Sequence, residues 1–291
     1  MTNTEWVFYS VYPGRVEYLD DLVAEVVAPC AERLSAREDV HRWFYIRYID
    51  EQGPHIRLRF QVNIDSVHFI EKGIEELLER ELFRITSEPI PKMTRLIPFH
   101  PDQLAKSEAE VIFQQEIYEP EYEKYGGKKG VDIAERCFES SSMLALVALK
   151  LERARVIDRF NLSLCIMDQA TKELSFSERE CDDLWEEMLH HWSGSSFPGG
   201  EEYKEKLVDG AKKRRQIVDE MLKGYESNSE VKEAVSAYCH CLKEAFDEVE
   251  ASPQIRLSKG HLMFHYTHMM NNRLGVWPIE EAYLAAILQE V

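Results

Sequence analysis

The sequence lacks any apolar run long enough to cross a membrane, and its start lacks the features of a secretory signal. A membrane-spanning helix needs about 18 or more apolar residues in succession, and no hydrophobic stretch of this chain approaches that length. Residues 1–6 are mostly polar and contain neither the basic region nor the apolar core of a signal peptide. We therefore expect a cytoplasmic protein without a membrane partner.

Metal-binding patterns are also scarce. The six cysteines include no Cys-x-x-Cys pair. Cys239 and Cys241 flank a histidine inside a helical pattern, where alternate residues point about 200° apart, so joint zinc binding would require an unwound helix. His261, His265 and His268 share one helix face, but no carboxylate at matching spacing completes a metal site. We expect reduced thiols, no metal and no cofactor.

Basic residues are outnumbered, with 35 lysines and arginines against 53 aspartates and glutamates, which gives a formal net charge of -18. Nucleic-acid binding depends on neutralising phosphates with basic surface, so no direct nucleic-acid partner is expected. With 291 residues and 44% hydrophobic content, the chain can bury one large core or two modest ones. A local cluster of arginine and histidine in so acidic a chain is a candidate site.

That cluster lies in residues 43–60, WFYIRYIDEQGPHIRLRF, which read as two strands around a turn. If the even-numbered apolar residues of both strands face the core, paired residues must both have even numbers or both have odd numbers, because paired side chains share a face. The turn then closes between Asp50 and Pro54, and residues 51–53 form a three-residue loop. Arg47 then lies opposite Arg57, on the face that also carries His55 and Arg59. Facing arginines repel each other unless an anion lies between them. This register predicts an anion site; the alternative is a solvated basic face.

The apolar period changes along the chain from two residues to about 3.6, which predicts strands followed by helices. Strands are expected at 5–12, in both arms of 43–60, at 94–98 and at 112–119. Helices are expected at 15–34, 63–83, 131–155, 177–192, 201–223, 231–249, 259–272 and 278–288. The prediction is an α+β fold in one composite domain, 1–291, with a mainly antiparallel sheet in about 1–125 and a largely helical part in about 130–291. Residues 193–200 are expected to be a flexible connector or surface loop.

Two further segments carry side chains suited to chemistry. Residues 117–127 combine tyrosines, among them Tyr125, with carboxylates and a closing Gly-Gly; a turn that covers the sheet edge is the alternative interpretation. Residues 261–275 read as a helix that ends at Gly275, with Arg273 in its last turn. His268 lies one turn earlier, and a histidine with its near-neutral pKa suits proton transfer, although a structural role is the alternative.

In this order and at these distances, WFYIRY with HIRLRF, then YEPEYEKYGG, then HMxxNRL closely resemble the lantibiotic dehydratase C-terminal domain family. That family also occurs as free-standing thiopeptide-type bacteriocin biosynthesis proteins. The resemblance extends over nearly the whole chain, from the strand around Trp6 to the helix at 278–288.

The resemblance implies a lyase that performs the elimination half of peptide dehydration. A separate glutamyl-tRNA-dependent protein glutamylates Ser or Thr of a ribosomally made precursor peptide with a leader segment, and this chain expels glutamate to leave dehydroalanine or dehydrobutyrine. Arg47 and Arg57 are then expected to anchor the glutamyl group and stabilise charge, and His268 to act as the acid/base. The substrate-binding candidates of second rank are His55, Arg59, Arg273 and Tyr125.

The residue types suit this chemistry independently of the resemblance. Planar, permanently charged arginine forks bind carboxylates and enolate oxygens, and histidine transfers protons near neutral pH. One alternative within the same family is a pyridine synthase, which joins two dehydroalanines in a formal [4+2] cyclisation and expels the leader peptide. Arg47, Arg57 and His268 favour elimination over cyclisation. A second alternative is a non-catalytic scaffold that binds the precursor peptide.

Overall fold

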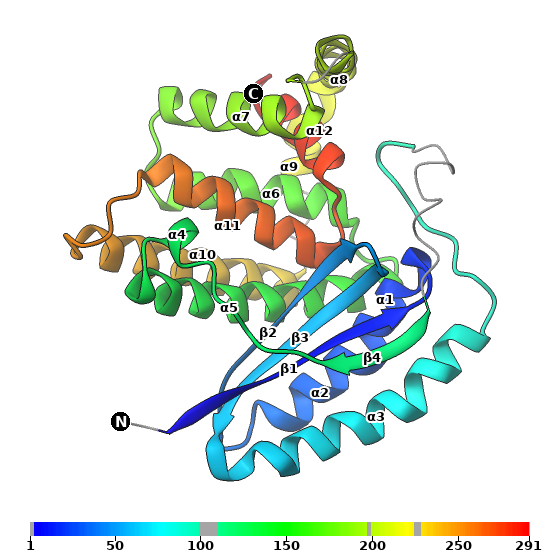
Figure 1. Cartoon of the computed structure of the whole chain (residues 1–291). Coiled ribbons are helices and arrows are strands. Elements are labelled where there is room, and N and C mark those ends of the chain that lie inside the picture. The colour runs from blue at the N-terminus through cyan, green and yellow to red at the C-terminus, as the bar shows by residue number, and fades with distance from the viewer. Residues whose placement is uncertain (1–2, 99–109, 197–198, 224–227, 291) are drawn as a thin grey trace. The chain divides into compact units, whose positions relative to one another are not determined.

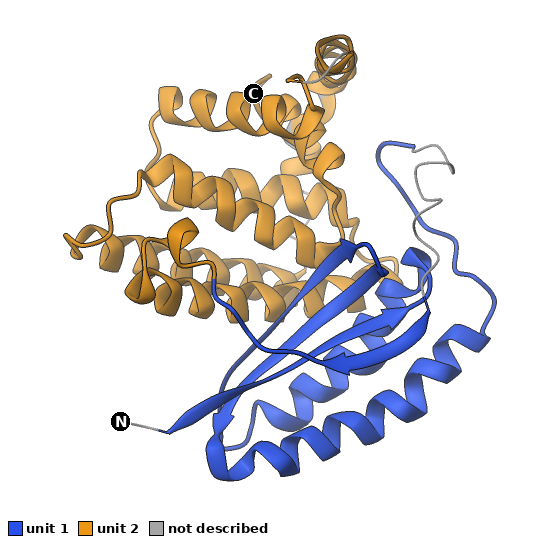
Figure 2. Ribbon diagram, viewed as in Figure 1, with its two compact units in different colours: residues 1–120 blue, residues 121–291 orange. Residues whose placement is uncertain are grey.

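The computed structural model describes residues 3–98, 110–196, 199–223 and 228–290. The chain divides into two compact units, Met1–Pro120 and Glu121–Val291 (Figure 2). The single composite domain stays a prediction. The sheet belongs to the first unit and the long helices follow in the second, so the predicted α+β fold is confirmed.

In its described residues, the first unit contains a four-stranded antiparallel sheet in the order β2-β3-β1-β4 (Figure 1). Helices pack on one face of this sheet, and Tyr9 of β1 donates a hydrogen bond of 2.8 Å to Glu75 on that side. The strands are β1 (Thr4–Pro13), β2 (Val40–Asp50), β3 (Gly53–Asn63) and β4 (Val111–Gln115).

The helical segment after β1 is broken into short pieces instead of the single helix predicted for residues 15–34. A 3-10 turn, η1 (Val16–Tyr18), leads into α1 (Leu19–Leu22), the π turn η2 (Val23–Val27) and α2 (Ala28–Leu34). Pro29 in the first turn of α2 has no N–H, and its ring would clash with the carbonyl four residues earlier. The wider π turn just before it accommodates that ring.

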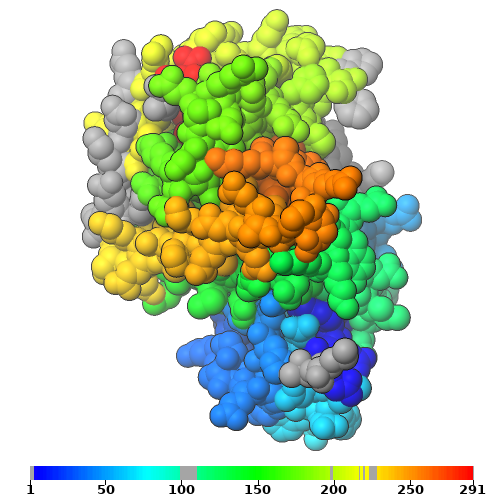
Figure 3. Space-filling model, turned by 90° about the vertical axis from the view of Figure 1, so that its left-hand side faces the viewer, coloured from blue at the N-terminus to red at the C-terminus, as the bar shows by residue number. Residues whose placement is uncertain are grey.

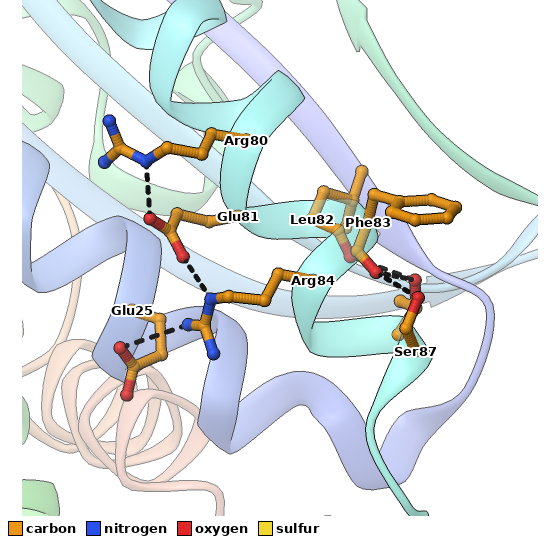
Figure 4. A network of polar contacts seen from close by, with 8 residues as sticks. Glu25, Arg80, Glu81, Leu82, Phe83, Arg84 and Ser87 are labelled. Carbon is orange, nitrogen blue, oxygen red and sulfur yellow. Dashed lines mark hydrogen bonds and ion pairs between the residues drawn. The ribbon is translucent and has the colours of Figure 1, made fainter.

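Helix α3 (Val67–Ser87) follows the 3-10 turn η3 (Ile64–Ser66) and covers most of the helix predicted for residues 63–83. Glu81 lies between Arg80 and Arg84, which donate to it at 2.7 and 2.6 Å, and Arg84 also reaches Glu25 of η2 at 3.4 Å (Figure 4). Exposed pairs of this kind contribute at most about 1 kcal/mol each. Most of the stabilisation of α3 therefore comes from its buried stripe, Ile70, Ile74, Leu78, Leu82 and Ile85.

The register of the hairpin differs from the prediction by one residue. Asp50 pairs with Gly53, which leaves a two-residue turn in place of the predicted loop 51–53, and Arg47 lies opposite Ile56 rather than Arg57. The carboxylate of Asp50 closes the turn by accepting hydrogen bonds from the N–H groups of Gln52 (2.9 Å) and Gly53 (3.2 Å). The predicted confrontation of two arginines is therefore wrong.

This register divides the hairpin side chains between the two faces of the sheet. The face that the helices cover carries Trp43, Tyr45, Arg47, Ile56, Leu58 and Phe60. The opposite face carries Phe44, Ile46, Tyr48, His55, Arg57 and Arg59. The predicted core assignment was right for β3 and wrong for β2, because residues 43–46 are apolar throughout and show no alternation that fixes their face.

The strand predicted at residues 94–98 is absent: these described residues form no regular structure. Pro91 and Pro98 lie on either side of its centre, and a proline has no N–H to give to a strand ladder. The strand predicted at 112–119 is present but shorter, as β4, and pairs with β1.

The second unit is helical in its described part. The helices predicted at 131–155, 177–192, 231–249, 259–272 and 278–288 are confirmed within a few residues at each end, whereas the segment 201–223 is divided by a 3-10 turn, η5 (Arg215–Ile217). Two helices were not predicted: the single turn α4 (Tyr122–Tyr125) and the longer α6 (Arg159–Glu173). The other helices are α5 (Lys128–Arg153), α7 (Glu178–Ser193), α8 (Gly200–Arg214), α9 (Val218–Lys223), α10 (Ser229–Glu250), α11 (Lys259–Leu274) and α12 (Pro278–Leu288).

No helix among the described residues is both long and apolar enough to span a membrane. Of the predicted connector 193–200, residues 197–198 lie outside the described residues, and Gly194 takes a left-handed conformation (φ 69°) at the end of α7. Glycine adopts that conformation without a steric penalty, which explains why α7 ends there.

Candidate functional site

In the first unit, His55 and Arg57 of β3 form a linked pair on the sheet face opposite the helices. His55 is fully buried; its Nδ1 lies 3.1 Å from the carbonyl oxygen of Gly53, and Arg57 donates from Nε to its Nε2 at 3.1 Å. A carbonyl only accepts and a guanidinium only donates. These two partners therefore select the neutral imidazole with its proton on Nδ1.

Burial keeps this imidazole neutral. It lowers the pKa of His55 below its ordinary value, while the Gly53 carbonyl and the carboxylates of Asp50 and Glu116 act in the opposite direction. The Asp50 carboxylate lies 3.8 Å from Nε2, too far for a hydrogen bond, and Nε2 already accepts from Arg57. His55 therefore fixes the direction of the Arg57 side chain instead of carrying charge itself.

Two tyrosines enclose this pair. The guanidinium carbon of Arg57 lies 3.7 Å from the ring centre of Tyr48, and the ring of Tyr12 lies 4.3 Å from that of His55. Tyr12 donates to Asp50 at 3.1 Å, and burial, together with that hydrogen bond, raises the pKa of Tyr12 to about 12, so it remains a phenol. No carboxylate of the described residues forms an ion pair with Arg57, which leaves its charge available to an anion.

Ser10 of β1 lies opposite Arg57 in the sheet, and its side chain points to the same face. Its hydroxyl is fully buried, and no described residue forms a hydrogen bond with it. A buried hydroxyl without a partner is uncommon, because the lost hydrogen bond costs about 1–3 kcal/mol. Ser10 therefore places a hydroxyl beside Arg57 on the sheet face opposite the helices.

Arg47 and Arg59 have different surroundings from Arg57. Arg47 lies on the face that the helices cover and forms an ion pair of 2.7 Å with Asp20 of α1. Arg59 is 6% exposed and lies among aromatic rings, 4.2 Å from the centre of Phe8 and 4.9 Å from that of Tyr118. Of the four predicted residues in this unit, the structure brings His55 and Arg57 into contact and places Arg47 on the other face.

In the second unit, His268 of α11 is held by a buried carboxylate. Its Nδ1 lies 2.9 Å from Oε1 of Glu281, a fully buried residue of α12, and its ring stacks on Trp192 of α7 at 4.5 Å. The His268 side chain is 20% exposed. Because Nδ1 is engaged by the carboxylate, Nε2 is the nitrogen left for proton transfer.

Glu281 has a perturbed acidity. Burial raises its pKa above the ordinary value, and the positive charge and hydrogen bond of His268, with a further hydrogen bond from Asn271, act in the opposite direction. A buried carboxylate bonded to one ring nitrogen of a histidine fixes the orientation of that ring. This geometry is suited to a general acid/base.

A second histidine on α11 has the opposite character. Burial first, and then the positive charge of Lys124 and of the neighbouring histidines, lowers the pKa of His265 to about 3. His261 packs against it with ring centres 4.5 Å apart and has its Nε2 3.2 Å from the Lys124 carbonyl oxygen. His265 therefore stays neutral near physiological pH, and no group of three or more potential metal ligands occurs among the described residues.

Arg273 and Tyr125 lie in the core of the second unit. Arg273 is fully buried and donates to Ser142 at 3.1 Å and to the Met269 carbonyl at 2.7 Å. Tyr125 is 2% exposed, with its ring 5.3 Å from Phe138, and the Arg273 guanidinium lies 4.9 Å from the same phenyl ring. The contacts of both residues tie α4, α5 and α11 together.

Sequence reasoning missed most of the neighbours that give these residues their properties. Glu281, Trp192, Tyr12 and Ser10 each contact or face a predicted residue from a distant part of the chain. Glu281 follows Pro278 in the first turn of a helix, where an acidic residue is favoured by the helix dipole alone. That local explanation conceals its contact with His268, and the sequence offers no other signal for it.

The second unit also contains a cavity of about 510 Å³ that includes none of the predicted site residues. It lies between the end of α6, the second half of α10 and the start of α11, on the surface that is yellow to orange in Figure 3. Apolar side chains such as Phe246, Ile255 and Leu262 line it together with charged ones such as Lys243 and Asp247. Its size is that of a small-molecule or side-chain pocket.

The profile of a protein family described as lantibiotic biosynthesis dehydratase C-term matches residues 6–291. A comparison with curated protein sequences finds no match.

Similar folds occur among solved structures. The pyridine synthase TbtD, from thiomuracin biosynthesis, is 16% identical with a TM-score of 0.70, and the match covers 98% of this chain and 96% of that chain. The tRNA-dependent lantibiotic dehydratase MibB from Microbispora sp. 107891 is 16% identical with a TM-score of 0.62, over all of this chain but 28% of that chain. TsrL is 16% identical with a TM-score of 0.60, over 97% and 93% of the two chains. At such identity the likeness establishes the fold.

Proposed function

The chain belongs to the lantibiotic biosynthesis dehydratase C-terminal family, and from that membership we propose that it is a glutamate-eliminating lyase of peptide modification. Its substrate is a ribosomally made precursor peptide in which Ser or Thr carries a glutamyl ester. Its products are free glutamate and a dehydroalanine or dehydrobutyrine residue in the peptide.

The reaction requires a base for one proton and a site for negative charge. A base removes the proton from Cα, the electron pair of that bond forms the Cα–Cβ double bond, and the Cβ–O ester bond breaks. Glutamate departs with that oxygen as part of its carboxylate. Negative charge builds on the peptide carbonyl during proton removal and on the leaving group afterwards, so positively charged or hydrogen-bonding groups accelerate both steps.

The observation that carries this proposal is the pairing of His268 with Glu281. The imidazole of His268 is partly exposed, and its Nδ1 faces the buried carboxylate of Glu281, which leaves Nε2 directed away from that partner. In a general-base role Nε2 takes the proton, and the carboxylate opposite Nδ1 stabilises the charge that develops on the ring. We assign His268 the role of acid/base and Glu281 that of a positioning residue.

We assign to Arg57 the binding of the carboxylate of the glutamyl group. Its guanidinium is oriented by His55 and Tyr48, and no carboxylate of the described residues neutralises it. Arg47 is given a positioning role instead of direct contact, because its ion pair with Asp20 ties β2 to α1. Arg59, Arg273 and Tyr125 are assigned to the support of the fold around these residues.

The partners follow from the chemistry of the substrate. Esterification of Ser or Thr by glutamate must precede elimination, and MibB, of which 28% matches this fold, is described as tRNA-dependent. We propose that a separate glutamyl-tRNA-dependent protein supplies the glutamylated peptide and that a leader segment of the precursor binds this chain. Addition of an extended leader to the exposed edge of β4 is one mode of recognition that the sheet permits.

The test uses the purified chain and a synthetic leader-fused peptide that carries a glutamylated Ser. We expect the mass of the peptide to fall by one glutamate, and we expect His268→Ala and Arg57→Ala to abolish this loss. His261→Ala is a matched control, since His261 lies on the same helix and contacts the Lys124 carbonyl instead of Glu281. No loss of glutamate with measurable peptide binding would refute the lyase and leave a peptide-binding scaffold.

A second candidate is a pyridine synthase, favoured by the extent of the match to TbtD, which covers nearly all of both chains. In that case a bis-dehydroalanine peptide loses its leader and gains a ring, and the glutamylated peptide is left unchanged. Running both peptides with the same enzyme preparation separates the two reactions by mass.

A further inference from the structure

Two cysteines of the second unit lie against each other across a helix pair. Cys137 of α5 and Cys241 of α10 have their sulfur atoms 3.9 Å apart, and the Cys137 sulfur is also 3.9 Å from the Cys241 carbonyl oxygen. Cys137 is 1% exposed, whereas Cys241 is partly exposed. Neighbouring Arg136 forms an ion pair with Glu248, which also joins α5 to α10.

The other cysteines have different surroundings. The Cys165 sulfur faces the backbone carbonyls of Met221 and Leu222 at 3.3 and 3.2 Å. Burial raises the pKa of Cys30 and of Cys239 to about 12, so neither forms a thiolate readily. Among the described residues, Cys137 and Cys241 are the only thiols whose sulfurs contact each other.

The two paired thiols differ in acidity. The hydrogen bond between the two thiols lowers the pKa of Cys241, with contributions from Ser140 and Arg136 and against the opposing effect of burial. The same contact and burial raise the pKa of Cys137. The more exposed sulfur is therefore also the better nucleophile, and the buried sulfur lies in contact with it. A reactive thiol beside a second thiol is the arrangement found at sites of reversible oxidation.

We propose that Cys137 and Cys241 form a modification site at which a peroxide converts the two thiols to an intramolecular disulfide. The Cys241 thiolate attacks hydrogen peroxide, the O–O bond breaks, and a sulfenic acid forms with release of hydroxide. The Cys137 sulfur then attacks the sulfenic sulfur, its proton leaves with the hydroxyl as water, and the S–S bond forms. In total, two thiols are oxidised and one peroxide is reduced to two waters.

The sulfurs must approach from 3.9 Å to about 2.05 Å for this bond. Helices α5 and α10 already pack closely along their length and are joined by the Arg136–Glu248 ion pair, so rotation of the two side chains supplies most of the approach. The bond locks α5 to α10, and α5 also carries Ser142, which holds Arg273 of α11. This inference does not depend on the proposed lyase activity.

The experiment treats the full chain with hydrogen peroxide, blocks the remaining thiols with N-ethylmaleimide under denaturing conditions, and measures the intact mass and the tryptic peptides. We expect two thiols to escape alkylation and the peptides 137–150 and 233–243 to be joined. Peptide 233–243 contains both Cys239 and Cys241. The variant Cys239→Ser therefore shows which of these two cysteines forms the disulfide. We expect the cross-link to persist in this variant, because Cys241 forms it.

Cys241→Ser is expected to abolish the cross-link, and dithiothreitol is expected to reverse it in the unmodified chain. Because Cys137 is in the core, the fold of Cys137→Ala is checked against that of the unmodified chain by circular dichroism before oxidation. The cross-link in the unmodified chain is measured independently of this variant. Oxidation of Cys241 to sulfinic acid without a cross-link, or a cross-link that involves Cys239, would overturn the proposal.

Discussion

Replacement of Glu281 by glutamine tests whether the buried carboxylate activates His268. Glutamine preserves the volume of the side chain and an oxygen that can accept from the His268 Nδ1–H, but it removes the negative charge 2.9 Å from the ring. A hydrogen bond to a charged group contributes about 1.5–3 kcal/mol. If that stabilisation applies to the imidazolium formed during turnover, kcat falls by about ten- to a hundredfold, at 1.36 kcal/mol for each factor of ten.

The same substitution is expected to leave stability unchanged or to increase it. The pKa of Glu281 is raised in the folded state, so between its unfolded and folded pKa values the folded chain binds more protons than the unfolded chain. Stability contributed by the protonated acid is therefore complete below the unfolded pKa, near 4.3, and is lost as pH rises through the folded pKa. Above the folded pKa the charged, buried carboxylate is a cost that glutamine removes, so the loss of activity should not be accompanied by a loss of stability.

Glu280→Gln is the matched control, because Glu280 is equally buried one position away and accepts from the Trp277 N–H at 2.9 Å at the start of α12. We expect that variant to lose about 0.5–1 kcal/mol of stability through the weakened cap while its kcat is nearly unchanged. Release of glutamate measures the rate of turnover of each variant, and urea unfolding followed by circular dichroism measures its stability. A kcat of Glu281→Gln within threefold of the unmodified enzyme would refute the reasoning.

Three further outcomes are expected. Arg57→Lys keeps the charge but loses the Nε–H donor to His55 and the stack on the tyrosine ring, so KM for the glutamylated peptide should rise about tenfold, and an unchanged KM in steady-state assays would exclude Arg57 as the carboxylate anchor. The ion pair of Arg47 with Asp20 should give a coupling energy of about 0.5–1 kcal/mol in a double-mutant cycle by urea unfolding, whereas strictly additive single effects would contradict it. The pKa of His265 is depressed from 6.5 to about 3 in the folded chain, so between these two pH values the unfolded chain binds more protons at this residue than the folded chain. The contribution of neutral His265 to stability is therefore complete above pH 6.5 and is lost as the pH falls towards about 3. His265→Gln should flatten the pH dependence of urea unfolding in that window, and an unaltered slope would contradict the assignment.

The helical part of the fold could be predicted because local signals agree there. The predicted helix at 177–192 has a Ser177 cap that receives the Glu180 N–H and a Gly194 stop, and the observed helix differs by one residue at each end. Helix α6 has comparable signals, with Asp158 accepting from the N–H groups of Phe160 and Asn161, although it is not among the predicted helices. Local capping signals therefore mark this helix as well as the predicted ones.

The hairpin register could not be predicted, because it depends on a side chain that closes the turn. Residues 43–46 are apolar throughout and are compatible with either face. The two-residue turn is stabilised by the carboxylate of Asp50, which accepts hydrogen bonds from the N–H groups of Gln52 and Gly53. The candidate site shows the same limit. His268 was recognisable from its helix position, whereas its bond to Glu281 depends on how α11 packs on α12, and no sequence spacing encodes that packing.

The two-residue turn at Glu51 and Gln52 makes chain length part of the site. If one residue were inserted there and the turn kept its two-residue geometry, β3 would pair with β2 one residue out of its present register. His55 and Arg57 would then point into the layer that packs against α1, and Ile56 and Leu58 would take their places on the opposite face. Natural variation at this turn should therefore favour substitutions over insertions or deletions. In a set of related sequences, the constant distance from Asp50 to Arg57 would be as diagnostic of an anion-binding hairpin as the arginine itself.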